Sequence, residues 1–181
     1  MLNRTQPASS PAWVQHQDSC GISLEMPRAW RLRIEPSVDA PGELEVSDPR
    51  GTAAAMLRAR RMPADRDLAH WLRLSYPATE AGLHNVIMLR VDEHGPQLAS
   101  ASFDYGSQVF SGRAQVVAMR HNDMAVLLVA AAARAEFPQR LPDLIRILGS
   151  LRVRGLVTGQ IGLERLMTAA LTPEATALLQ R

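Results

Sequence analysis

The stretch Arg113–Ala133, with the sequence RAQVVAMRHNDMAVLLVAAAA, decides the fold class. Its second half, Met124–Ala133, is wholly apolar but is only about half as long as the ~20 residues that a membrane-spanning helix needs. Valine favours strands, and the asparagine and aspartate of His121–Asp123 tolerate the positive φ of a tight turn. We therefore predict two antiparallel strands joined by a turn at these residues, in place of a membrane helix or a catalytic His–Asp pair.

Alternating apolar and polar residues predict further strands on the N-terminal side of this hairpin. Residues 22–26 alternate strictly and end at Pro27, which cannot continue a ladder of hydrogen bonds. A second hairpin has its turn at Asp48–Gly51 and its second strand runs to Met62. Three more segments have strand length and strand character, namely residues 31–35, 84–95 and 97–108. Together they predict an antiparallel sheet.

Two segments change to the spacing of an amphipathic helix. The first begins near Asp65 and stops before Pro77. The second carries apolar residues on one face, and proline is tolerated only in the first turn of a helix, so Pro142 places the start of its regular part near Leu141. The apolar face of this second helix is predicted to consist of Phe137, Leu141, Leu144, Ile145, Leu148 and Leu151.

The predicted fold class is α+β, an antiparallel β-sheet flanked by helices, with a C-terminal helical tail. The length of 181 residues fits one domain with appendages. We expect a flexible N-terminal arm at residues 1–19, an α/β domain at 20–153 and an amphipathic helical tail at 154–181. The tail either packs back on the domain or docks on a partner. Its predicted partner-binding residues are Leu163, Leu166, Met167 and Leu171.

Composition excludes several classes of protein. The sequence has no lysine, which excludes phosphate-loop lysines and Schiff-base enzymes. Its single cysteine, Cys20, excludes an intrachain disulfide and any multi-cysteine metal site. The net charge is only +2 with acids and arginines interspersed, so we expect no nucleic-acid partner. The start of the chain lacks the apolar segment of a signal peptide, and we expect no stable membrane insertion.

No group of residues predicts a catalytic, cofactor or metal site. His16, Asp18 and Cys20 alternate and are potential metal ligands, but a polar arm leading into the first strand explains them better. Ser107 and Ser111 lack the glycine-flanked elbow of a nucleophilic serine. We therefore expect no cofactor and no enzyme activity.

Two kinds of side chain remain as candidates for partner binding. Arg58 and Arg60 share one face of a predicted strand, where they either contact an anionic partner or protect a sheet edge. Four methionines suit an adaptable apolar groove and equally suit an ordinary core. They are Met56, Met88, Met119 and Met124.

The order of these elements resembles the PsbP-like α/β fold, which is shared by DcrB-type bacterial proteins and the Eag chaperones of type VI secretion. The matching segments are GISLEMPRAW at 21–30, the helix near 68–76, the strands of 97–133, and LPDLIRILGSLRV at 141–153. The resemblance implies an adaptor, assembly factor or chaperone. The Eag branch further implies a cytoplasmic homodimer that shields apolar helices of secreted effectors, although this chain departs from that branch by its long C-terminal tail.

The resulting functional hypothesis is a non-enzymatic adaptor or chaperone that holds an apolar segment of a partner protein with one sheet face and the tail. One alternative is a small-ligand-binding protein or enzyme whose pocket lies between sheet and helix, lined by Trp30, Trp71 and Tyr105. The other is a structural subunit that its tail anchors in a larger assembly.

Overall fold

The computed structural model describes residues 12–18, 21–35, 43–79, 83–106 and 110–153. The predicted tail residues Leu163, Leu166, Met167 and Leu171, together with Cys20, lie outside the described residues. The strands are β1 (Trp13–Gln17), β2 (Ile22–Pro27), β3 (Arg31–Glu35), β4 (Glu43–Ser47), β5 (Ala53–Arg61), β6 (Ile87–Gly95), β7 (Leu98–Gly106), β8 (Ser111–His121), β9 (Met124–Ala133) and β10 (Arg152–Val153). The helices are α1 (Leu68–Leu74), α2 (Tyr76–Thr79) and α3 (Phe137–Ser150).

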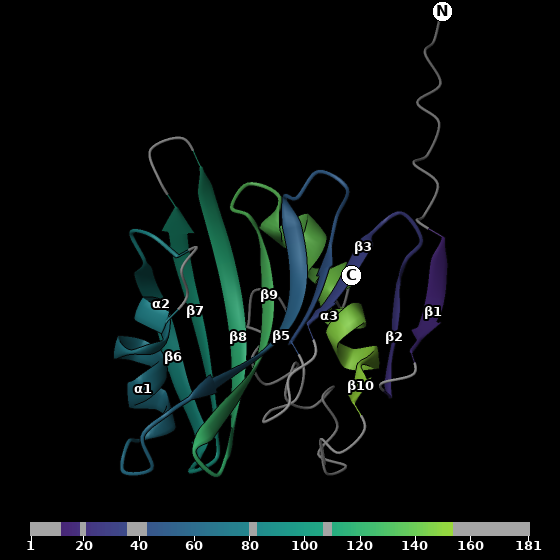
Figure 1. The fold of residues 1–181 in the computed structure, drawn as a ribbon. Coiled ribbons are helices and arrows are strands. Elements are labelled where there is room, and N and C mark those ends of the chain that lie inside the picture. Colours follow the sequence, from purple (N-terminus) through teal and green to yellow (C-terminus); the bar gives the residue numbers. More distant parts are fainter. Residues whose placement is uncertain (1–11, 19–20, 36–42, 80–82, 107–109, 154–181) are drawn as a thin grey trace, which may run out of the picture.

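Within these residues the strands form two antiparallel sheets (Figure 1). The larger, seven-stranded sheet has the order β3-β4-β5-β9-β8-β7-β6, and the smaller has the order β1-β2-β10. Antiparallel sheets flanked by helices confirm the predicted α+β class, whereas the predicted helical tail at residues 154–181 lies outside the described residues. No helix in the described part of the chain is both long and apolar enough to cross a membrane.

The apolar run Met124–Ala133 is the central strand β9. Its neighbours are β5 on one side and β8 on the other. The strand is almost entirely buried because both faces of the sheet are covered there, so the period-2 alternation of a half-exposed strand is absent. Asn122 has φ 55° in the turn between β8 and β9, which confirms the predicted hairpin.

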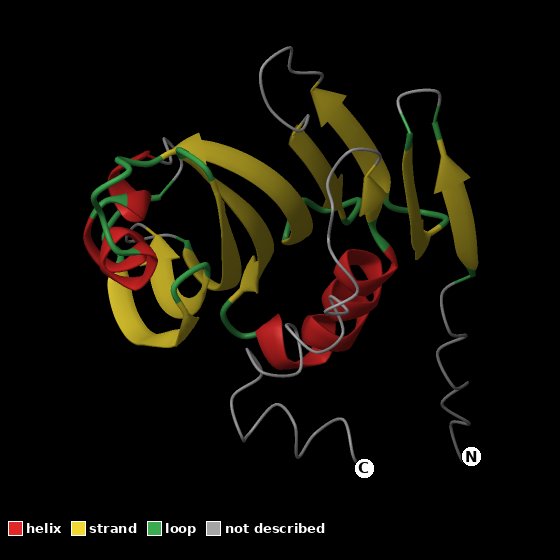
Figure 2. Ribbon diagram, turned by 90° about the horizontal axis from the view of Figure 1, so that it is seen from below, coloured by secondary structure: helices red, strands yellow, loops and turns green. Residues whose placement is uncertain are grey.

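Helices cover opposite faces of the seven-stranded sheet (Figure 2). α3 packs on one face with Val126, Leu128 and the small sheet, and we call this the α3 face. α1 packs on the other, the α1 face, against residues such as Leu127 and Val129. Two separate hydrophobic cores therefore share β9 as their common wall.

The structure corrects the predicted start and one face residue of α3. The helix begins at Phe137, because Glu136 accepts the amides of Gln139 and Arg140 and so closes a first turn ahead of Pro142. Pro142 lies inside the helix, not at its start. Ile147 is buried in the apolar face of this helix, whereas Ile145, which the sequence pattern had assigned to that face, is only half-buried.

A strand lies within the segment that the sequence analysis assigned to the N-terminal arm, while the predicted division into arm, domain and tail stays a prediction. Trp13–Gln17, assigned to the arm, forms β1 and pairs with β2. The Arg146 guanidinium on α3 lies 4.0 Å from the centre of the Trp13 ring, and the same arginine donates to Glu25 at 2.9 Å. Strand β1 thus packs against two elements of the domain, β2 and α3.

Candidate functional site

A row of aromatic rings runs along the α1 face from the core to the surface. Trp71, Tyr76 and Phe103 are buried, with ring centres 5.8 Å and 6.3 Å apart along the row. Tyr105 continues the row at 6.2 Å from Phe103, and Phe110 ends it at 6.1 Å from Tyr105. Phe110 is 42% exposed. The row therefore presents an apolar ring to solvent at its outer end.

Two glycines make room for the outer end of this row. Gly112 on β8 lies opposite Tyr105, and a Cβ at position 112 would lie 2.7 Å from the phenol oxygen. Gly106 has φ 144°, which favours glycine, and a side chain there would collide with the Phe110 backbone. The phenol end of Tyr105 therefore lies against Gly112, and burial raises the pKa of its phenol.

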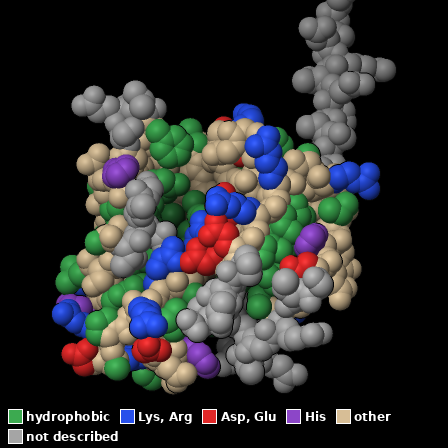
Figure 3. Space-filling view, in the orientation of Figure 1, with side chains coloured by type: hydrophobic (Ala, Val, Ile, Leu, Met, Phe, Trp, Pro, Cys, Tyr) green, Lys and Arg blue, Asp and Glu red, His purple; other side chains and the backbone are tan. Residues whose placement is uncertain are grey.

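Small residues surround the aromatic end on the same face. Ala114 on β8 and Ala131 on β9 are almost completely buried, although α1 contacts mainly β6, β7 and β8. Met56 on β5 and Met88 on β6 are partly buried against this core. Figure 3 shows a hollow with hydrophobic walls beside a group of acidic and basic side chains.

The charged group on this face consists of Glu43, Glu45, Arg58 and Arg60. Arg58 donates to Glu43 at 2.9 Å and to Glu45 at 3.1 Å, and Arg60 also contacts Glu43. These charges largely neutralise one another across β4 and β5. Partner binding by Arg58 and Arg60 stays a prediction, and both are already paired within the chain.

The structure separates residues that the sequence had grouped. Trp30 belongs to the core of the α3 face, whereas Trp71 and Tyr105 lie on the α1 face, so these three cannot line one pocket. Met119 likewise packs on the α3 face, away from Met56 and Met88. Strand pairing together with the alternation of side chains along each strand separates Met119 from Met56 and Met88, but it does not place Trp30, which lies in a turn, or Trp71, which lies on α1.

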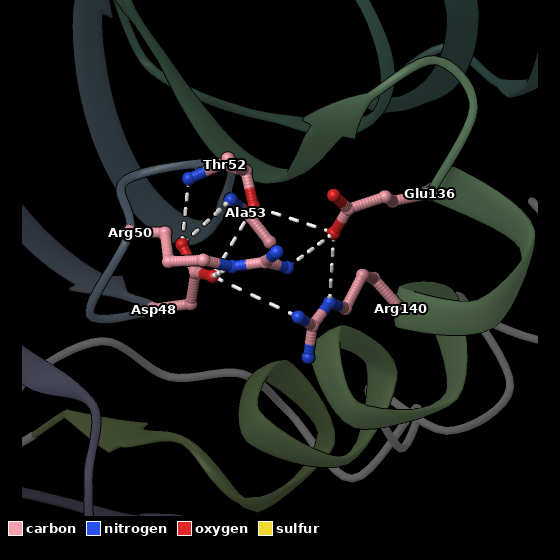
Figure 4. A network of polar contacts seen from close by, with 6 residues as sticks. All are labelled: Asp48, Arg50, Thr52, Ala53, Glu136 and Arg140. Carbon is pink, nitrogen blue, oxygen red and sulfur yellow. Dashed lines mark hydrogen bonds and ion pairs between the residues drawn. The ribbon is translucent and has the colours of Figure 1, made fainter.

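Two buried carboxylates hold the sheet in shape. Asp48 accepts the amides of Thr52 and Ala53 at 2.6 Å and 3.1 Å, and Arg140 of α3 lies 3.8 Å from it (Figure 4). Burial would raise the pKa of Asp48, but these amides, the Thr52 hydroxyl and Arg140 together lower it. This network fastens the β4–β5 turn to the start of α3.

Asp104 is the second buried carboxylate. Arg113 on the neighbouring strand donates to both of its oxygens, at 2.7 Å and 3.1 Å, and Arg134 lies 3.4 Å away. The hydrogen bonds from Arg113 are the main reason that the pKa of Asp104 is lowered, against the opposing effect of burial. Both carboxylates are held by hydrogen bonds and nearby arginines, an arrangement typical of a structural role.

Other candidate chemistry does not assemble in the described part of the chain. No group of three or more His, Cys, Asp or Glu side chains there could hold a metal ion. Sequence reasoning missed one polar pair: His94 Nε2 lies 2.8 Å from the Ser100 hydroxyl. Ser100 is 3% exposed, which closes it to a substrate, and Asp92 beside this pair is bound to Arg90.

No family model matches this chain, and no curated protein matches it. It is similar to the solution structure of cyanobacterial PsbP (CyanoP) from Synechocystis sp. PCC 6803, with 11% identity, a TM-score of 0.49, and coverage of 84% of this chain and 98% of that one. It is also similar to LpqN, involved in cell envelope biogenesis of Mycobacterium tuberculosis, with 18% identity, a TM-score of 0.38, and coverage of 75% and 87%.

A third similar structure comes from Bacteroides thetaiotaomicron VPI-5482, with 11% identity and a TM-score of 0.40 over 75% of this chain and 46% of that one. These similarities concern the fold alone. The first of them is itself a PsbP, the family whose fold the sequence resembles, while the DcrB-type and Eag assignments stay predictions.

Proposed function

We propose that this protein is a non-catalytic adaptor or chaperone that holds an apolar segment of a partner protein on the α1 face. The observation that carries the proposal is the aromatic row. Four of its rings lie in or against the core, and the fifth, Phe110, is 42% exposed. An exposed ring backed by a rigid aromatic row is an anchor of the kind that protein interfaces use.

The charged group on the α1 face favours an apolar segment over a charged ligand, because its charges are already paired. Glu43 and Glu45 already neutralise Arg58, and Met56 beside them offers a polarizable thioether 3.5 Å from the Arg58 guanidinium. A polar rim around an apolar centre is the usual anatomy of a protein interface.

The resemblance to Eag chaperones suggests which partner to test first. A secreted effector with an apolar helix, bound in the cytoplasm before export, fits the chemistry of the α1 face. The proposal does not depend on that choice of partner, because the contact requires only an apolar segment.

The test is the binding of a fluorescent, Leu- and Ala-rich peptide of about 20 residues, measured by anisotropy, with a polar scramble of the peptide as reference. Burying a phenylalanine ring contributes about 2 kcal/mol, so Phe110→Ser is expected to weaken binding at least tenfold. Ile87→Ser is the matched control, because Ile87 is 64% exposed and pairs with Asp104 on the opposite face. Unchanged binding by Phe110→Ser, or an equal loss with Ile87→Ser, refutes the proposal.

A further inference from the structure

The two edge strands of the seven-stranded sheet differ in what they expose. β6 is 9 residues long, and Ile87 and Leu89 on it are 64% and 48% exposed. No strand in the described residues pairs with its outer side. At the other edge, β3 has 5 residues, and its aliphatic side chains Leu32 and Ile34 pack against the core. A long edge strand with exposed aliphatic side chains is a template for pairing with another strand.

We propose that β6 pairs antiparallel with β6 of a second copy of this chain, about a two-fold axis at Val91. The contact lies outside the hollow that carries the proposed function, so each can fail without the other. It joins the two large sheets into one continuous sheet.

Charge complementarity within β6 selects this register. Arg90 and Asp92 lie on one face of the sheet, since they pair with Ser102 and Ser100 of β7, and they form an ion pair of 2.6 Å. Antiparallel pairing about Val91 places Arg90 directly opposite Asp92 of the second copy, and the symmetry repeats the contact. Opposite charges that face each other across strands stabilise the pair, and like charges there destabilise it.

Other registers lose this complementarity. Shifting the axis by one residue, to Arg90 or Asp92, sets neither charge opposite its complement. A second copy of β6 therefore complements the charges of this edge better than an unrelated strand does. It carries Asp92 opposite Arg90 and Arg90 opposite Asp92.

The contact is short, and the association is accordingly weak. The pairing of β6 with β7 is irregular between Met88 and Arg90 and again between Glu93 and Gly95. Bulges of this kind limit edge pairing, so only the segment between them forms a regular ladder. We expect a reversible dimer that forms at high protein concentration, as small interfaces do.

Charge reversal tests the register by sedimentation velocity of the full chain over a concentration series. Arg90→Asp places two acids opposite each other, and Asp92→Arg places two arginines opposite each other. Each is expected to weaken dimerisation at least about tenfold. The double variant R90D/D92R restores both pairs and is expected to dimerise within about twofold of the wild type. A mixture of the two single variants is expected to form heterodimers.

The matched control is Arg33→Asp on β3, where Arg33 forms a similar ion pair with Glu35 at the other edge. It is expected to leave dimerisation unchanged. Hydrogen exchange supplies a second readout, in which amides within residues 90–93 become more protected as the protein concentration rises. A wild type that stays monomeric at several hundred micromolar overturns the proposal. So does a double variant as weak as the single ones, or an equal loss with Arg33→Asp.

Discussion

Tyr105 and Gly112 face each other across β7 and β8, and the phenol ring lies over the place where residue 112 has no side chain. The backbone of one strand thus supports an aromatic ring of the next. Because Tyr105 in turn contacts Phe110, this pairing fixes the position of the exposed ring on which the proposed function depends.

Gly112→Ala is expected to displace the Tyr105 ring and to lower the free energy of unfolding by about 1–3 kcal/mol, since an added methyl group overpacks the contact. Chemical denaturation measures the loss, and the tyrosine NMR signals report the displacement. Gly149→Ala is the matched control. A Cβ at Gly149 meets nothing within 4 Å in α3, so alanine is expected to stabilise the helix by about 0.5–1 kcal/mol. Equal effects of the two variants would contradict this account.

Asp48→Ala is expected to destabilise the protein by about 2–3 kcal/mol at neutral pH. The change leaves the amides of Thr52 and Ala53 without their acceptor in a nearly buried site. Urea unfolding checks this value, and hydrogen exchange should show faster opening of the β4–β5 turn. A loss below about 0.5 kcal/mol would show that the network does not hold α3 to the sheet.

Stability should fall in acid partly through Asp104. Its pKa is lowered from the ordinary 3.8, so its contribution is present above that value and is lost as the pH falls through the lower pKa of the folded protein. Asp104→Asn is expected to be less stable at neutral pH, and its difference from the wild type should shrink below pH 3.8. A difference that stays constant between neutral pH and about pH 2 would contradict the assignment.

Trp13→Ala is expected to lower the free energy of unfolding by about 1–2 kcal/mol. Arg146 loses the ring on which it stacks, and β1 loses part of its packing. Thermal unfolding measures the effect. Arg33→Ala serves as reference, since exposed ion pairs contribute little. If Trp13→Ala proves neutral, residues 13–17 are not part of the stable domain and the sequence-based boundary at residue 20 was right.

The sequence predicted the elements that local patterns specify. Valine-rich β8 and β9, the turn at Asn122 and the hairpin at Asp48 all follow from periodicity and turn chemistry. Patterns along the chain do not say which face of the sheet each helix covers. That is why Trp30 and Trp71 were grouped although they belong to different cores.

The candidate site was predictable only in part. Tyr105 was named as a binding residue, but the aromatic row depends on pairing between β7 and β8 and on the contact with α1 and α2. Glycine at position 112 carried a signal, since glycine within a strand often marks close approach by another group. Only the register of β7 and β8 shows that Tyr105 is the residue that approaches Gly112.

The most direct test of the central claim is NMR mapping of the full chain as the apolar peptide is added. The account predicts that the largest shifts occur at Tyr105, Phe110 and Gly112 and at the Met56 methyl group, with little change at Ile87. Shifts concentrated on the opposite face, or no shift at peptide concentrations in the hundreds of micromolar, would contradict the claim that the α1 face binds an apolar segment.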